Sequence, residues 1–144
     1  MSQIIIWATD GSSVAEDALP MAKRLATTFE AKLVAVHVNQ TVVVQGARHP
    51  VIVDEPDIRA RVRRAVRSMR AHGIDAELRI VGPTPDGPAQ GIAEFAAAVR
   101  ADVIVLGTQR RPAFSAVLHG SVAPRLLGRA PCPVVVVPPP CDGS

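Results

Sequence analysis

Residues 103–111 read Val-Ile-Val-Leu-Gly-Thr-Gln-Arg-Arg, and this stretch decides the fold. Its apolar run leads directly into Gly107, which is typical of a buried strand that ends in a phosphate-binding loop. About a dozen residues later, Gly120 and Ser121 stand at the start of a predicted helix. A glycine loop and a helix start can together present backbone N–H groups to phosphate. Arg110 and Arg111 stand where such loops usually have small residues, so the stretch predicts a phosphate cradle with an altered middle.

The composition favours a single α/β domain. The chain has 144 residues, of which 48% are hydrophobic and only 3% aromatic, and it has no tyrosine. Its core must therefore be built from Val, Ile, Leu and Ala, which suits a parallel sheet that is buried on both faces. We expect one domain over residues 1–138 and a loose tail over residues 139–144.

Charge and cysteine content argue against several classes of protein. The net charge is only +3, and acidic residues are mixed through most of the chain, so nucleic acid is not the expected partner. Cys132 and Cys141 lie among prolines and form neither a metal motif nor a disulfide framework. The apolar run at residues 4–8 is too short for a signal peptide or a membrane span. We therefore expect a cytoplasmic protein without a membrane segment.

Strands and helices alternate along the chain. Pro20 predicts a kink in the first helix rather than a break, and the polar residues Glu77 and Arg79 predict that the third strand lies at an edge. Such alternation predicts parallel strands with right-handed crossovers, and a ligand site where the strand order reverses. Strands are predicted over 3–9, 32–38, 76–81, 103–106 and 134–137, and helices from Ser13 through Phe29, over 56–72, from Pro88 until Ala101-Asp102, and from Ser121 until Gly128.

Two segments leave alternatives open. Residues 39–56 have valine runs on both sides of a polar centre, which is compatible with a small hairpin or with a mobile flap. The helix over 56–72 carries several arginines opposite an apolar face. Such a helix can bind nucleic acid or an anionic membrane. The interpretation we favour is a helix packed on the sheet with a solvated outer face, because no aromatic residues accompany the arginines.

The motifs at residues 5–12, 101–108, 120–122 and 130–136 together resemble those of the universal stress protein family. The resemblance covers almost the whole chain, except residues 39–56. It implies a Rossmann-like α/β fold of the adenine nucleotide alpha hydrolase type. This fold is an open five-stranded parallel sheet of order 3-2-1-4-5 with helices on both faces. It also implies a homodimer through the last strand, here Val134, Val135, Val136 and Val137.

Nucleotide-binding members of this family resemble one another in a Gly-x2-Gly-x9-Gly-[Ser/Thr] loop. Here Gly107, Gly120 and Ser121 match the motif with intact spacing, but Arg110 replaces the second glycine. Arginine there can either block the pocket or bind phosphate. Asp10 stands where an aspartate contacts ribose or a nucleotide-bound Mg. The resemblance implies a nucleotide site formed by Ala8, Thr9, Asp10, Val38, Leu106, Gly107, Arg110, Gly120, Ser121, Val122 and Ala123.

The expected function is that of a cytoplasmic stress-response protein that binds ATP, with or without Mg, or another adenine nucleotide. No general base is evident, because His37, His49, His72 and His119 are scattered. Sensing or sequestration with at most slow hydrolysis is therefore expected, and enzymatic activity is left open. The alternative is a member that binds no nucleotide and acts on protein partners through its dimer surface. An ATP-pyrophosphatase and a response-regulator receiver are disfavoured, because their motifs are absent after the first and last strands.

Overall fold

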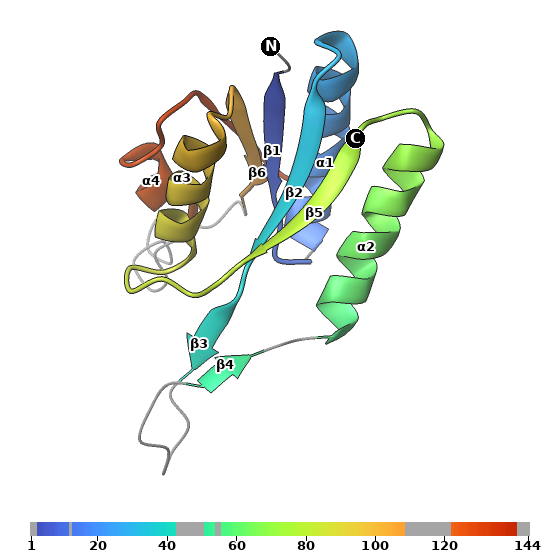
Figure 1. Ribbon diagram of the computed structural model, residues 1–144. Helices are drawn as coiled ribbons and strands as arrows, with labels where there is room; N and C mark the ends of the chain where they lie inside the picture. The colour runs from blue at the N-terminus through green and yellow to red at the C-terminus, as the bar shows by residue number, and fades with distance from the viewer. Residues whose placement is uncertain (1–2, 12, 43–50, 54–55, 109–121, 141–144) are drawn as a thin grey trace.

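The computed structural model describes residues 3–11, 13–42, 51–53, 56–108 and 122–140. Helices and strands alternate along the chain as predicted, with one additional short strand pair between the second predicted strand and the second helix (Figure 1). In chain order the elements are β1 (Ile4–Ala8), α1 (Ser13–Thr28), β2 (Lys32–Val38), β3 (Gln40–Val42), β4 (Val51–Val53), α2 (Pro56–Ala71), β5 (Ala76–Val81), α3 (Pro88–Val99), β6 (Val103–Gly107), α4 (Val122–Leu127) and β7 (Val134–Val137).

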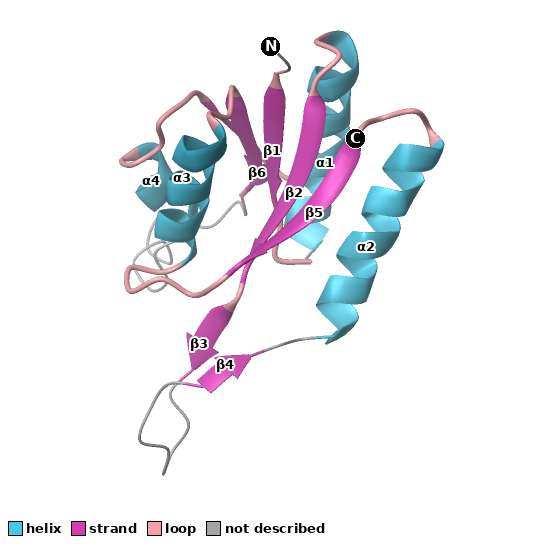
Figure 2. Ribbon diagram, viewed as in Figure 1, coloured by secondary structure: helices cyan, strands magenta, loops and turns pink. Residues whose placement is uncertain are grey.

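The main sheet has five parallel strands in the order β5-β2-β1-β6-β7 (Figure 2). This confirms the predicted order 3-2-1-4-5 and the edge position of β5. The chain first builds outward from β1 to β2 and β5, and then crosses back to add β6 and β7 on the other side. The order therefore reverses between β1 and β6, where open α/β sheets bind ligands beyond the carboxyl ends of the strands.

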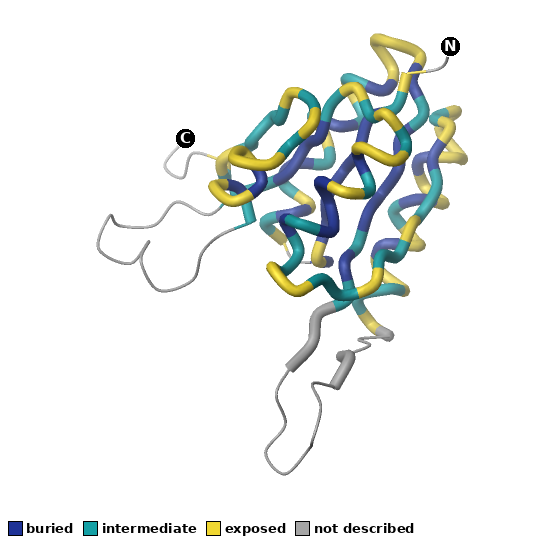
Figure 3. Tube along the Cα trace, turned by 60° about the vertical axis from the view of Figure 1, so that its left-hand side comes forward, coloured by how far each residue is buried: buried dark blue, intermediate teal, exposed yellow. Residues whose placement is uncertain are grey.

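Both faces of the sheet are buried, as the apolar strands predicted. Alternate residues of β1 point to opposite faces. Ile5 and Trp7 pack with α1 and α2, whereas Ile6 and Ala8 pack with α3 and α4. Figure 3 shows the buried strands between helices that are buried on one side and exposed on the other.

Helix α1 approaches the sheet through small side chains. Its buried residues are Ala15, Ala18, Ala22 and Ala26, spaced three and four apart along one helix face. The Trp7 indole N–H donates to the Ala15 carbonyl (2.9 Å) and ties the start of α1 to β1. The helix continues through Pro20, so the proline does not break it, as predicted.

Helix α3 begins as predicted but ends differently. Pro88 is its first residue and follows Gly87 as the N-cap, a position where the missing N–H of proline costs nothing. The helix closes at Arg100 in the left-handed conformation (φ 55°), not at Ala101-Asp102 as predicted. Asp102 instead joins β1 to β6, because its carboxylate accepts a hydrogen bond from the Ile4 N–H (2.8 Å).

The segment between β2 and α2 contains a hairpin rather than an unpaired flap. Strands β3 and β4 are antiparallel, with Gln40 opposite Val53 and Val42 opposite Val51. The hairpin projects beyond the carboxyl edge of the sheet (Figure 1). Residues 43–50, which connect its strands, lie outside the described residues.

Helix α2 packs its apolar side on the sheet and presents arginines to solvent. Val62, Val66 and Met69 are buried in the core, while its arginines from Arg61 to Arg70 are exposed. This agrees with the interpretation that we favoured from the sequence. In the part of the chain that the structure describes, no helix has the length and apolar character needed to cross a membrane.

Candidate functional site

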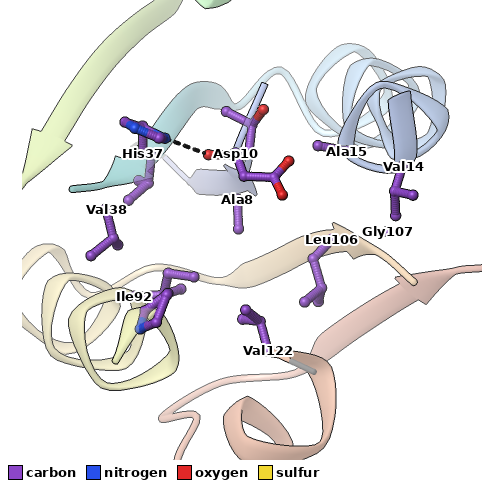
Figure 4. A pocket seen from close by; sticks show the side chains of 13 residues that line it. Ala8, Asp10, Val14, Ala15, His37, Val38, Ile92, Leu106, Gly107 and Val122 are labelled. Atoms are coloured by element: carbon purple, nitrogen blue, oxygen red, sulfur yellow. Dashed lines mark hydrogen bonds between the residues drawn. The ribbon is translucent and has the colours of Figure 1, made fainter. Parts of the chain in front are cut away.

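A cavity of about 100 Å³ lies at the point where the strand order reverses, between the carboxyl ends of β1 and β6 (Figure 4). Its walls come from β1, β2 and β6 and from the helices α1, α3 and α4. The cavity brings together several residues predicted from the sequence although they lie more than a hundred positions apart. Those residues are Ala8, Thr9, Asp10, Val38, Leu106, Gly107 and Val122.

The other predicted site residues fall elsewhere. Ala123 is buried in the core on the α3–α4 side of the sheet, and it is not among the described residues that line the cavity. Arg110, Gly120 and Ser121 lie outside the described residues, so their predicted contacts stay predictions.

Several lining residues were missed by sequence reasoning. Val36 and His37 come from the end of β2, and Val14 and Ala15 come from the first turn of α1. The strand order implied by the resemblance could have indicated His37, because β2 is the neighbour of β1 and its carboxyl end reaches the same edge. Pro88 and Ile92 line the cavity from α3, and only the packing of α3 on the sheet brings them there.

The polar rim of the cavity is braced by backbone hydrogen bonds. The Thr9 N–H donates to the Val36 carbonyl (3.0 Å), and the Gly11 N–H donates to the Thr9 hydroxyl oxygen (3.0 Å). His37 Nδ1 lies 3.1 Å from the Thr9 carbonyl oxygen. Because a carbonyl oxygen can only accept, Nδ1 donates its proton in this contact. Asp10 follows directly and is exposed at the rim.

The turn after Asp10 is held by α2. Gly11 has a φ of 79°, and a Cβ at this position would overlap the side chain of Ile58. The Arg61 guanidinium donates to the Gly11 carbonyl (2.9 Å). Helix α2 thus holds the loop that carries Asp10. Its contacts with Gly11 therefore help to set the position of Asp10 at the cavity.

Gly107 has a packing role that the sequence did not predict. A Cβ at this position would overlap the Val14 carbonyl oxygen at the start of α1. Substitution would therefore require a backbone shift, because backbone atoms cannot rotate away as a flexible side chain can. The glycine is needed for the close approach of α1 to β6, whether or not a ligand also uses the space beside it.

The described residues hold no cluster of three or more His, Cys, Asp or Glu side chains that could bind a metal ion. Asp10 provides one carboxylate at the cavity. One carboxylate suits Mg²⁺ that is held mainly by ligand phosphates and water, but it does not suit a site made by protein side chains alone.

Comparison with known proteins agrees with the fold. The model of the universal stress protein family matches residues 1–138. The chain belongs to this family. A universal stress protein from Thermus aquaticus, named for its position 3' of a QAH/OAS sulfhydrylase, is 32% identical over 145 residues. The alignment covers 95% of this chain and 99% of that protein.

Solved structures of universal stress proteins share the architecture. A family member from Burkholderia pseudomallei is 30% identical, with a TM-score of 0.68 and coverage of 94% of this chain and 96% of that one. A universal stress protein crystallised in complex with cAMP is 25% identical, with a TM-score of 0.69 and coverage of 94% and 95%. The family thus includes a protein of this fold that holds an adenine nucleotide.

Proposed function

We propose that this universal stress protein binds ATP or another adenine nucleotide in the cavity between β1 and β6, as a cytoplasmic stress-response protein that senses or sequesters the nucleotide. The observation that carries the proposal is the convergence of Ala8, Asp10, Val38, Leu106 and Gly107 on one cavity at the switch point. The relative that was crystallised with cAMP supports the same class of ligand.

The chemistry of the walls suits the two halves of a nucleotide. Val38, Ile92, Leu106 and Val122 form an apolar slot, which suits the faces of a purine ring. Asp10 at the rim suits a ribose hydroxyl or an Mg²⁺ ion carried by the phosphates. We propose at most slow hydrolysis.

The described cavity of about 100 Å³ is smaller than the roughly 300–1,000 Å³ typical of ligand sites. We therefore assign the phosphates to the loop beyond Gly107, with backbone N–H groups and the hydroxyl at Gly120 and Ser121. In this proposal Arg110 is a phosphate ligand, because a guanidinium matches the geometry of phosphate oxygens.

We also propose that residues 1–138 form a single domain and that two copies of this domain form a homodimer through β7. The Ile104 N–H donates to the Pro133 carbonyl and the Thr108 N–H to the Val137 carbonyl (both 3.0 Å). Odd-numbered residues of this strand thus face β6, so the backbone groups of Val134 and Val136 point away from the sheet. An apolar edge strand without charges is usually covered, and a second copy of β7 would cover this one.

Isothermal titration calorimetry on nucleotide-free protein, with ATP, AMP and cAMP as ligands, tests the nucleotide proposal. We expect binding of at least one of them. We expect Arg110→Gly to raise the dissociation constant at least about tenfold, because a charge-assisted hydrogen bond is worth roughly 1.5–3 kcal/mol. Arg111→Gly is the matched control. Tighter binding by Arg110→Gly would show that the arginine blocks the site.

The second candidate function is that of a universal stress protein that binds no nucleotide and acts on protein partners through its dimer surface. The small volume of the described cavity favours it. Absence of heat, and of any thermal shift at millimolar ATP, would select this candidate over the first.

A further inference from the structure

Strand β5 leaves one row of backbone groups directed away from the sheet. The Leu33 N–H donates to the Asp75 carbonyl (2.8 Å), and the Asn39 N–H donates to the Val81 carbonyl (2.9 Å). Together with the register of Leu33 opposite Ala76, these bonds show that the odd-numbered residues face β2. The N–H and C=O groups of Ala76, Leu78 and Ile80 therefore point outward, where a further strand would pair.

One end of this row is already occupied. The Arg70 guanidinium donates from Nε to the Ala76 carbonyl (2.6 Å), so α2 closes the amino-terminal end of the edge. Leu78 and Ile80 remain as the outward-facing residues of the strand. They offer two donors and two acceptors, enough to pair with a short extended segment.

A groove runs between α2 and this edge. It is lined by Arg63, Arg67, Arg70, Leu78, Arg79 and Ile80, among others. Arg63, Arg67 and Arg70 recur at helical spacing, so they form one row along the side of α2 that borders β5. The groove thus combines an open strand edge, three apolar residues and a row of guanidinium groups.

The positive charge of the groove is largely uncompensated. Among the described residues, no carboxylate forms an ion pair with Arg63 or Arg67. Glu77 is already engaged, with Lys32 Nζ at 3.2 Å and Arg79 Nε at 3.3 Å from its carboxylate oxygens. The arginines are therefore available for carboxylates of another molecule, and the guanidinium fork suits a carboxylate in two-bond geometry.

Other occupants fit this groove less well. A second copy of the chain would bring two rows of arginines together, which costs energy. Single-stranded nucleic acid uses aromatic stacking platforms, and none of the residues that line the groove is aromatic. A membrane surface needs exposed apolar anchors, whereas the large exposed apolar residues of the described chain are Phe29 and Leu127, outside α2.

We propose that an extended acidic peptide segment of a partner protein binds in the groove between α2 and β5 by adding a strand to the sheet. Its backbone pairs with Leu78 and Ile80. Its glutamate or aspartate side chains, at alternate positions, face Arg63 and Arg67. This mode of recognition takes affinity from the main chain and specificity from alternate side chains. The site is separate from the nucleotide cavity and from β7.

The test uses a fluorescein-labelled heptapeptide in which glutamate alternates with threonine, titrated with the full-length protein and followed by fluorescence anisotropy. N-methylation at alternate peptide positions removes the donors on one side of the peptide strand and leaves the protein unchanged. We expect one of the two alternating N-methyl sets to weaken binding at least tenfold and the other to leave it within about twofold. Equal binding of both sets would overturn strand addition.

Protein variants test the charged side of the groove. We expect Arg63→Gln combined with Arg67→Gln to weaken binding of the peptide about tenfold, and the control Arg24→Gln combined with Arg125→Gln to leave it unchanged. A peptide with glutamine in place of glutamate should bind as weakly to wild-type protein as the acidic peptide binds to the groove variant. Displacement of the acidic peptide by equimolar oligouridine or by phosphatidylserine vesicles would overturn the choice of partner.

Discussion

The two edges of the sheet have the same backbone arrangement and different side chains. At β5 the outward-facing residues beyond the Arg70 contact are Leu78 and Ile80, and at β7 they are Val134 and Val136. Strand β5 is bordered by arginines of α2, whereas β7 consists of valines and lies between prolines. The backbone makes both edges able to pair, and the neighbouring side chains determine which kind of partner each edge accepts.

This difference has a physical basis in self-recognition. In a two-fold pair each residue meets a copy of its own surroundings. Valines pair favourably with valines across antiparallel strands, whereas arginine rows repel one another. We therefore assign the second copy of the chain to β7 and an acidic partner to β5.

The largest expected effect is the loss of the proposed β7 dimer in Val136→Pro. Proline removes the outward N–H of Val136 but none of the bonds to β6, and edge strands tolerate proline at such positions. Two unpaired acceptors per dimer should raise the dissociation constant about 100-fold, at roughly 1–3 kcal/mol each. Analytical ultracentrifugation measures the change, with Val136→Thr as the control that keeps the N–H. A Val136→Pro protein that stays dimeric would place the dimer contact elsewhere.

A smaller effect is expected when the arginines beside β5 are neutralised. In Arg63→Gln combined with Arg67→Gln, the β5 edge loses much of the repulsion that keeps it from pairing with itself. The average mass in solution should then rise above that of the dimer as the protein concentration increases, most clearly at low salt. Light scattering across a dilution series measures this. If the variant shows no additional association, the arginines do not prevent β5 from pairing with a second copy of itself.

The smallest effect is expected for Glu77→Gln on β5. Burial alone raises the pKa of the Glu77 carboxyl, but hydrogen bonds from Lys32 and Arg79 outweigh it and hold the pKa below its ordinary value. The contribution to stability is thus present above the pKa of an unfolded glutamate and is lost as the pH falls through the lower pKa of the folded state.

At neutral pH this substitution should lower the free energy of unfolding by less than about 1 kcal/mol. Urea unfolding at pH 7 and at pH 3 measures the difference between wild type and variant, which should shrink at the lower pH. A difference that grows on acidification would contradict the assignment of the carboxylate as the stabilising form.

The fold could be predicted from the sequence because the hydrophobic patterns that indicate it are local and recur along the chain. The alternation of apolar strands with amphipathic helices predicted parallel crossovers, and motifs spread over almost the whole chain implied the strand order. The close of α3 was mispredicted, because Arg100 adopts a left-handed conformation that non-glycine residues rarely adopt. The hairpin of β3 and β4 was one of two open alternatives, since short valine runs do not specify their own pairing.

The candidate site was predictable only in part. Ala8, Asp10, Leu106 and Gly107 were predicted because the motifs that resemble the family lie there, and the structure brings these residues to one cavity because the ends of neighbouring parallel strands meet at one edge. His37 was missed although the implied place of β2 beside β1 could have indicated it, whereas Ile92 reaches the cavity only through the packing of α3 on the sheet. Arg110 stays a prediction, because it lies outside the described residues.

The amino-acid sequence thus sufficed for the class of fold, the strand order implied by its motifs and the edge of the sheet at which the cavity lies. Only the tertiary structure explained why position 107 requires glycine, because the Val14 carbonyl approaches it too closely for a Cβ. The tertiary structure was also needed for the contrast between the two edges, since the arginines of α2 border β5 only after the helix has packed beside it. The hydrophobic periodicity that indicates helices and strands can be recognised within a few neighbouring residues. These contacts instead join segments that are far apart in the sequence and meet only when the sheet has formed.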